Sequence, residues 1–432
     1  MASGKELCEG VEWRIRVVDG SSEVLVPPTG LARKVWLRTK GLISGLGMKV
    51  RMFLKQAWDM GANDPRKVIH CIKVGLALTI VSLVYFMRPL YDGVGGNAMW
   101  AIMTVVVVFE PTVGATLYKC LNRVCATCLA GFLAVGVHWI ASQSGDRFEP
   151  FVVGASIFIL GYRVDKLFDL AHQRISTIII GTSLCILVIM LVCPIWSGQE
   201  LHSLTVRNMD KLSDSLDGCV RLYFTNSNGE DDQKLQGYKC VLSSKASEES
   251  MANFARWEPS HGRFNFRHPW KQYLKIGASM RSCAYCIEAL NSCINSENQA
   301  AESIKKHLST SCLKVSSSSS SAIKELAESV KKMNKSPTID LLVEEMNSAL
   351  EELHNDLKSL SHLLNPSTTA ENQISATGLV PFMEIIPVVT LASILIEISV
   401  RIEALVGSVE ELVKESEMKD KIVAKEEKPE EP

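Results

Sequence analysis

The chain has 432 residues, of which 47% are hydrophobic, and its formal net charge at pH 7 is −1. The balanced charge excludes a basic excess of the kind that binds nucleic acid. Its apolar residues cluster between about positions 68 and 198. We therefore predict an all-α fold, with a polytopic membrane helical domain followed by a cytosolic helical bundle domain. The expected regions are a basic cytosolic N-terminal region at 1–66, a transmembrane domain at 67–198, a cytosolic helical domain at 199–413 and a disordered charged tail at 414–432.

The N-terminal region is polar at first and basic later. Met1–Ser22 lacks the apolar core of a signal peptide, so the first membrane span would act as the insertion signal. Residues 33–67 carry nine Lys and Arg against two acids, which predicts a cytoplasmic N-terminus. Val50, Phe53 and Trp58 could form one face of a basic amphipathic helix on an anionic leaflet. A solvated basic linker is the alternative.

Four stretches are apolar enough to predict membrane spans, because about 20 residues of helix cross the hydrocarbon core. Glu110 lies inside the second of them, where a buried carboxyl costs ~2.5–3.5 kcal/mol. That cost predicts a polar pathway or a charged partner beside Glu110. The predicted spans are Val68–Met87, Asn97–Arg123, Val124–Ser142 and Ile175–Ile195.

Phe151–Tyr162 is apolar but has only 12 residues, about 18 Å of helix, which is short for a span. If it crosses the membrane, the C-terminal half of the chain faces outward. If it dips in and returns, that half stays cytosolic. We favour the cytosolic placement because the C-terminal half contains many of the 13 cysteines of the chain, and we expect these cysteines to be free thiols.

The C-terminal half shows the apolar periodicity of packed helices. Ser316–Ser321 reads as a flexible linker. Gly378–Val406 is apolar enough for a further span, but its apolar residues from Val388 to Leu412 repeat with a period of 3.5, so we predict a packed or coiled aqueous helix. Two other helical seams are Ile276, Met280, Cys283, Ile287, Leu290 and Ile294, and Leu342, Met346, Leu350, Leu353, Leu357, Leu360 and Leu364.

No enzyme, cofactor or metal centre is predicted. The sequence shows no nucleophile–base arrangement, phosphate loop or paired-carboxylate site. Cys125 and Cys128 form one Cys-x-x-Cys pair, and Cys283 and Cys286 form another. Neither pair has a second ligand pair nearby in sequence, so a zinc site is not expected.

Six stretches in order carry a resemblance to a known family. They are DPRKVIHCIKVGLAL (Asp64–Leu78), NAMWAIMTVVVVFE (Asn97–Glu110), VGATLYKCLNR (Val113–Arg123), GYRVDKLFDLAHQR (Gly161–Arg174), CPIWSGQELH (Cys193–His202) and WEPSHGRFNFRHPW (Trp257–Trp270). Over nearly its whole length the chain resembles the plant aluminium-activated malate transporter family of anion channels. The resemblance implies a dimer with six membrane helices per subunit, a helical cytosolic domain and passage of malate and other anions.

The chain departs from that family at one place. Gly154–Leu160 runs straight into Gly161, where the resemblance implies two full helices joined by a basic loop. The end of the fourth helix, the loop and most of the fifth helix are therefore expected to be missing. The alternative function is a non-conducting subunit that pairs with full-length relatives and regulates them.

The candidate anion pathway consists of cationic side chains, because a carboxylate must exchange its hydration for fixed positive charge. Arg123 and Arg174 are the best candidates, since the planar guanidinium can donate two parallel hydrogen bonds to a carboxylate. We place them at the starts of two spans, toward opposite membrane faces. The resemblance implies the same two arginines. Lys73 and Lys119 are weaker candidates, and snorkelling at helix ends is the alternative for all of them.

The acidic candidates have other roles. Glu110 has three candidate roles: a gate, a neutral structural acid, or an ion-pair partner either of Lys73 or of a pore arginine. Asp92, Asp165 and Asp169 are possible outer ligands for aluminium, and the resemblance suggests Asp169 most. Trp257–Trp270 is interpreted as aromatic packing, with binding of a nucleotide or lipid headgroup as the alternative.

The predicted function is therefore a membrane anion channel, gated by voltage or ligands, in a homodimer or a heterodimer with full-length relatives. A coupled organic-anion transporter is a further alternative. The multi-pass protein is expected in the plasma membrane rather than the vacuolar membrane. Its predicted partners are malate, other anions and the lipid bilayer, and nucleic acid is not among them.

Overall fold

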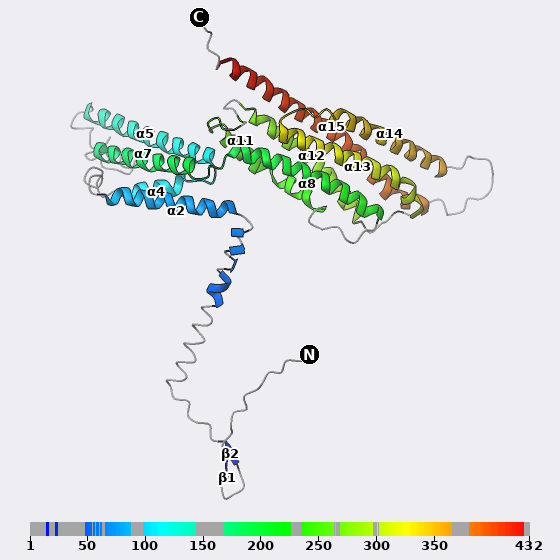
Figure 1. Cartoon of the computed structure of the whole chain (residues 1–432), viewed down its shortest axis with the longest axis horizontal. Helices are drawn as coiled ribbons and strands as arrows, with labels where there is room; N and C mark the ends of the chain where they lie inside the picture. The colour runs from blue at the N-terminus through cyan, green and yellow to red at the C-terminus, as the bar shows by residue number, and fades with distance from the viewer. Residues whose placement is uncertain are drawn as a thin grey trace, which may run out of the picture. The chain divides into compact units, whose positions relative to one another are not determined.

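The computed structural model forms two compact units, Met1–Ile69 and His70–Pro432, which we describe separately (Figure 1). The residues that the structure describes are 14–16, 22–24, 48–53, 55–56, 58–59, 61–62, 65–87, 98–143, 167–225, 235–262, 264, 268–296, 300, 302–364 and 380–426.

The first unit contains the only two strands among the described residues. β1 (Arg14–Arg16) pairs with β2 (Ser22–Val24) in antiparallel register, with Arg14 opposite Val24. The described residues between 48 and 62 are helical and expose Phe53 and Trp58. The other regular elements of the described chain are α-helices, as predicted, and one isolated bridge joins His261 and Phe264.

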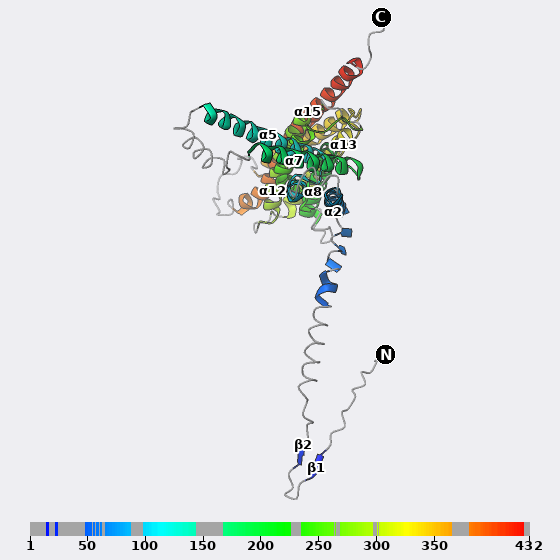
Figure 2. The same ribbon diagram turned by 90° about the vertical axis from the view of Figure 1, so that its left-hand side faces the viewer.

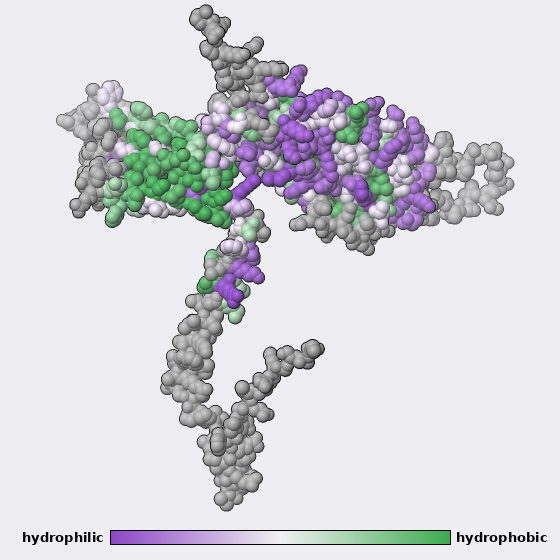
Figure 3. Space-filling model, viewed as in Figure 1, coloured by the Kyte–Doolittle hydropathy of each residue, from purple (hydrophilic) through white to green (hydrophobic). Residues whose placement is uncertain are grey.

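Four apolar helices pack around one core in the first part of the second unit. A shared cluster of buried Ala, Val, Ile and Cys side chains holds them together. Their surface is hydrophobic, as the green area of Figure 3 shows. The helices are α2, which begins just before the second unit (Pro65–Phe86), α4 (Ala98–Val108), α5 (Val113–Gln143) and α7 (Leu167–Leu191).

The predicted span Asn97–Arg123 is wrong as one continuous helix. α4 ends at Val108, and α5 begins at Val113 and continues without a break to Gln143. Pro111 explains the interruption, because proline has no backbone N–H and disfavours the helical conformation of the residue before it, Glu110. The Thr116 hydroxyl stabilises the turn by contacting both the N–H and the carbonyl oxygen of Glu110, at 3.1 and 3.2 Å.

Within the described residues, seven helices form the bundle that follows. Its surface is largely polar, as the purple area of Figure 3 shows, and Figure 2 views the helices roughly end on. α8 packs against α12 and α13, and α15 packs against α12, α13 and α14. The helices are α8 (Ser197–Thr225), α10 (Gly237–Ser243), α11 (Lys245–Ala255), α12 (Trp270–Ile294), α13 (Glu302–Lys332), α14 (Ile339–Leu364) and α15 (Val380–Glu426).

The predicted seams of α12 and α15 are confirmed, and the α14 seam is confirmed in part, because Leu342, Leu350 and Leu357 are partly buried against the same core and the side chains of Leu360 and Leu364 lie outside the described residues. All six seam residues of α12 are buried, and so are Met346 and Leu353 of α14. On α15, every seam residue from Val388 to Leu412 is buried in the bundle core. By length and composition, residues Ile385–Glu417 could also cross a membrane, as could Pro65–Phe86 and Gln173–Leu191. The packing of the α15 seam favours the predicted bundle helix.

The flexible linker predicted at Ser316–Ser321 is wrong, because these residues lie in the middle of α13. Four of the six serines are buried. Ser320 shares a hydrogen bond with Ser213 of α8 at 2.7 Å, and the Ser319 and Ser399 hydroxyls lie 3.5 Å apart between α13 and α15. Small side chains let three helices approach closely while their hydroxyls find partners, so a run that resembles a linker forms a buried helix interface of the bundle.

The disordered tail predicted from residue 414 also begins too early, since α15 continues to Glu426. Lys and Glu dominate this stretch and are strong helix formers. The cysteines that the structure describes are free thiols, as expected.

Candidate functional site

Helix α5 carries a polar stripe among the apolar helices. Thr116, Lys119, Arg123 and Thr127 follow one another at spacings of three and four residues, so they share one helix face. Other positions of α5 are strongly exposed and apolar, including Leu129 and Phe132. A helix with lipid-type side chains on one side and cations on the other is suited to line a pathway.

Arg123 is the central member of this stripe. Its Nε atom is buried and has no hydrogen-bond partner among the described residues. The residue lies about 15 Å from the start of α5, at ~1.5 Å per residue. The expectation that Arg123 stands at the start of a span was therefore wrong: it lies within a continuous helix, because the predicted boundary at residue 123 does not exist.

Arg174 lies in α7, which packs against both α4 and α5. Its guanidinium carbon sits 3.4 Å from the ring centroid of Trp100 on α4, a cation–π contact. It lies about 25 Å from the end of α7, again at ~1.5 Å per residue. The Trp100 ring thus holds the Arg174 guanidinium among the apolar helices.

Glu110 and Lys119 form an ion pair, with the Glu110 carboxylate at the turn between α4 and α5. The Lys119 side chain is 41% exposed and the Glu110 side chain 32%. Of the sequence alternatives for Glu110, the structure shows an ion pair, with Lys119 rather than with Lys73 or an arginine. The carboxylate is not in the middle of a span, because the helix breaks there.

Lys73 on α2 is fully buried and donates a hydrogen bond from Nζ to the carbonyl oxygen of Cys193 at 2.7 Å. Cys193 follows the end of α7 and has a positive φ of 43°. A cation beside the last carbonyls of a helix interacts favourably with the helix dipole. Lys73 therefore fastens α2 to the connection between α7 and α8.

Three proposed aluminium ligands have no described side chain. Asp169 lies in the first turn of α7, and only its backbone is described. Asp92 and Asp165 lie outside the described residues, and so does the short apolar segment Phe151–Tyr162.

The Trp257–Trp270 segment joins α11 to α12, and the rings of its described residues pack as predicted. The Trp196 and His261 rings stack with centroids 3.9 Å apart, and Phe264 and Trp270 lie 5.3 Å apart. The buried Tyr273 hydroxyl lies 3.0 Å from Nδ1 of His202. This aromatic cluster joins the start of α8 to the start of α12.

Glu258 is the residue that sequence reasoning missed. Its carboxylate is buried and accepts hydrogen bonds from the backbone N–H groups of Gly114, Ser197 and Gly198, at 3.1, 2.5 and 3.0 Å. The first donor belongs to α5 and the other two to α8. The sequence offered one signal, an acid inside an otherwise aromatic and basic segment, but not the identity of its partners.

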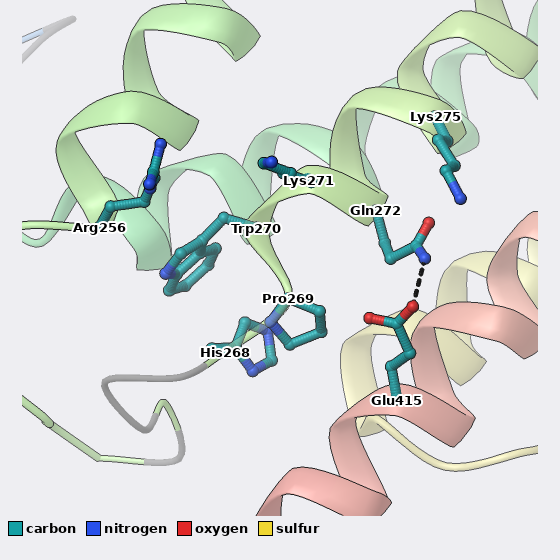
Figure 4. A pocket seen from close by; sticks show the side chains of 8 residues that line it. All are labelled: Arg256, His268, Pro269, Trp270, Lys271, Gln272, Lys275 and Glu415. Carbon is teal, nitrogen blue, oxygen red and sulfur yellow. Dashed lines mark hydrogen bonds between the residues drawn. The ribbon is translucent and has the colours of Figure 1, made fainter.

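A pocket of about 340 Å³ lies beside this segment (Figure 4). Gln272 donates to Glu415 at 2.6 Å, and Lys275 pairs with Glu411 at 3.2 Å. Stacking of a nucleotide base on Trp270 is disfavoured, because the indole is buried against Gly198. The pocket is lined by Arg256, His268, Pro269, Trp270, Lys271, Gln272, Lys275 and Glu415.

The electrostatic environment of the Cys-x-x-Cys pair on α12 disfavours metal binding. Burial raises the pKa of Cys283 to about 12, so its thiol stays protonated at neutral pH. Metal ligation needs the thiolate. Within the described part of the chain, no group of three or more His, Cys, Asp or Glu is placed to hold a metal ion.

The chain is similar to proteins that are named as malate transporters. A sequence model described as "Aluminium activated malate transporter" matches residues 58–162 and 159–379. The chain is 50% identical to "Aluminum-activated malate transporter 10" of Arabidopsis thaliana, over 93% of each chain. It is 41% identical to "Aluminum-activated malate transporter 2" of the same plant, over 86% of this chain and 80% of the relative. It is 37% identical to "Aluminum-activated malate transporter 1" of Triticum aestivum, over 75% of this chain and 81% of the relative.

Proposed function

Because the chain belongs to the aluminium activated malate transporter family, we propose that it is a membrane channel that conducts malate and other anions. One observation carries the proposal for the pathway. The Arg123 Nε lies buried within the apolar helices without an acceptor among the described residues. A buried N–H donor of a cation that has no acceptor costs free energy, and a carboxylate that passes and accepts its hydrogen bond would offset that cost.

The polar stripe of α5 extends the proposed pathway toward the bundle. Lys119 lies one turn before Arg123 and forms an ion pair with Glu110, so breaking that pair would add net positive charge to the path. Arg174 is the second arginine of the proposed path, and Trp100 restrains its guanidinium. Lys73 contributes to the path through its charge only, since its Nζ is bonded to the Cys193 carbonyl.

Charge reversal at Arg123 tests the proposal. Two unit charges 4 Å apart interact by about 4 kcal/mol at an effective dielectric constant of 20. Arg123→Glu replaces an attraction of this size by a repulsion of similar size, so anion current under a malate gradient should be abolished. Arg207→Glu is the matched control, because Arg207 is an exposed arginine on α8 of the bundle.

Surface expression of both variants must equal that of the unmodified protein. Normal current in Arg123→Glu would refute the proposed pathway, as would an equal loss of current in Arg207→Glu. A reversal potential that does not follow the malate gradient would refute anion conduction. Flux coupled stoichiometrically to another ion would instead support the coupled transporter.

A second candidate function, a non-conducting regulatory subunit, rests on the comparisons. The alignment with "Aluminum-activated malate transporter 10" runs over 463 positions, more than the 432 residues of the chain, so that relative has segments that this chain lacks. The two matched parts of the chain meet at residues 159–162, where the sequence predicts missing helix. Co-expression with a full-length relative distinguishes the candidates: a regulatory subunit lowers the partner's current and passes none alone.

We further propose a dimer in the plasma membrane with a cytoplasmic N-terminus. The exposed apolar positions of α5 and α2, such as Phe132 and Phe86, provide surface for lipid or a second subunit. Asp169, Asp165 and Asp92 remain the proposed outer ligands for aluminium.

A further inference from the structure

The Glu258 carboxylate caps two helices at once. The first backbone N–H groups of a helix have no partner within the helix, and a carboxylate placed there also interacts favourably with the helix dipole. Glu258 is only 2% exposed, and its Oε1 accepts from Gly114 and Ser197 while Oε2 accepts from Gly198. It comes from neither helix, so one side chain fixes the start of α5 to the start of α8.

Two glycines make this arrangement possible. A Cβ atom at Gly114 would lie 2.4 Å from the carbonyl oxygen of Phe254 and 2.9 Å from Glu258 Cγ. A Cβ atom at Gly198 would lie 2.3 Å from the Trp270 ring. The start of α5 therefore presses against Glu258 and the end of α11, and the start of α8 presses against the start of α12.

Aromatic contacts surround the same junction. The Tyr118 ring of α5 lies 5.8 Å from Phe254 and 5.7 Å from Trp257. The Ser197 hydroxyl donates a hydrogen bond to the Thr112 hydroxyl at 2.7 Å, and the Val113 N–H donates one to the Ile195 carbonyl oxygen at 2.9 Å. The first turn of α5 is thus held from the bundle side by rings, glycines and one carboxylate.

This first turn belongs to the helix that carries the polar stripe. Gly114 and Arg123 are nine residues apart on α5, about 14 Å along a continuous helix. A packed helix moves largely as a rigid element, so a displacement of its start also displaces Arg123.

We propose that Glu258 is a positioning residue that couples the helical bundle to the anion pathway, by holding the start of α5 in register with α8. The coupling rests on the proposed channel function. When the bundle shifts α11 relative to α8, the carboxylate transmits the shift to α5, and the position of Arg123 changes with it.

Three variants test the proposal in the full-length protein. Glu258→Ala removes all three hydrogen bonds. Glu258→Gln keeps one acceptor oxygen but loses the charge, so it should be intermediate. Glu249→Ala is the matched control, an exposed glutamate of α11 without an ion-pair partner among the described residues.

The first readout does not depend on conduction. In Glu258→Ala, hydrogen exchange at the Gly114, Ser197 and Gly198 amides should be at least ~10-fold faster, because hydrogen bonds to a charged acceptor protect strongly. The rate of modification of Cys128 on α5 by a thiol reagent should change as well. Both values should stay unchanged in Glu249→Ala.

The second readout is gating. The voltage or ligand dependence of opening should shift in Glu258→Ala and partly recover in Glu258→Gln, while unitary conductance and reversal potential stay the same. Unchanged exchange at the three amides would overturn the shared cap. Faster exchange with unchanged Cys128 reactivity and unchanged gating would overturn the coupling.

If the unmodified protein passes no current, the proposed channel function fails, and the exchange and thiol readouts still decide whether Glu258 positions α5. If Glu258→Ala does not fold, the comparison of Glu258→Gln with Glu249→Ala decides it by the same measurements.

Discussion

Replacing Arg281 by Met should strongly destabilise the bundle, because it leaves a buried carboxylate without its cation. Arg281 on α12 donates through Nη1 to Oε2 of Glu248 on α11 at 2.5 Å, and the two side chains are 13% and 2% exposed. Ser244 donates the other hydrogen bond, to Oε1 at 2.6 Å. α11 leads directly into the segment that carries Glu258, so this pair also secures the junction with α5.

The expected loss follows from the burial of the pair. Breaking a buried ion pair by removing one partner costs about 3–5 kcal/mol. For a helical domain of 150–250 residues, 1 kcal/mol changes Tm by about 2–4 °C. Arg281→Met should therefore lower the unfolding midpoint of the bundle by roughly 6–20 °C. The double variant Glu248→Gln, Arg281→Met leaves no unpaired charge, so it should lose much less.

Thiol modification during heating measures this transition in the detergent-solubilised full-length protein. Cys283 is fully buried on α12 and becomes reactive only when the bundle opens. Its modification is quantified by mass spectrometry, with Lys314→Met as a control that breaks an exposed pair with Glu352. An equal midpoint for Arg281→Met and Lys314→Met, or additive effects in the double variant, would refute the reasoning.

Three further predictions use the same assay. Ser320→Leu should lower the unfolding midpoint, because overpacking a tight interface costs about 1–3 kcal/mol. Ser317 is exposed, so Ser317→Leu should leave the midpoint unchanged. Equal midpoints for the two variants would show that the serine face of α13 is loosely packed. Gly198→Ala should destabilise the bundle, because the added Cβ clashes with Trp270. Gly407→Ala should stabilise the bundle by about 0.5–1 kcal/mol, because a Cβ there meets nothing within 4 Å. A lower unfolding midpoint for Gly407→Ala than for Gly198→Ala would contradict the described junction. Burial raises the pKa of Cys283 to about 12, so the folded state keeps this thiol protonated. The resulting contribution to the free energy of unfolding is fully present below the pKa of the unfolded thiol and is lost as the pH rises toward 12. Cys283→Ala should therefore weaken the fall of the unfolding midpoint between pH 8 and pH 11.

Periodicity explains what could be predicted about the bundle. The seams of α12, α14 and α15 depend on residues three and four positions apart, and a helix brings those positions to one face whatever surrounds it. The same logic decided Val388–Leu412, where a period of 3.5 outweighed a composition that would suit a membrane span.

The boundaries in the membrane helices depended on more than hydrophobicity. Lys119 and Arg123 looked like the end of a span, yet they lie inside α5, because other helices cover one of its faces. Pro111 was a local signal for the real break, and its effect on Glu110 was predictable from its missing N–H.

The amino-acid sequence by itself determined the family, the helical class and the cationic residues of the proposed pathway. Tertiary structure alone decided which groups meet: Glu110 with Lys119, Lys73 with the Cys193 carbonyl, and Glu258 with two helix starts. These partners depend on how helices pack, and the Glu258 carboxylate bonds a backbone N–H 144 residues away in the chain. Local periodicity carries no information about such contacts, because burial and hydrogen-bond satisfaction are properties of the assembled fold.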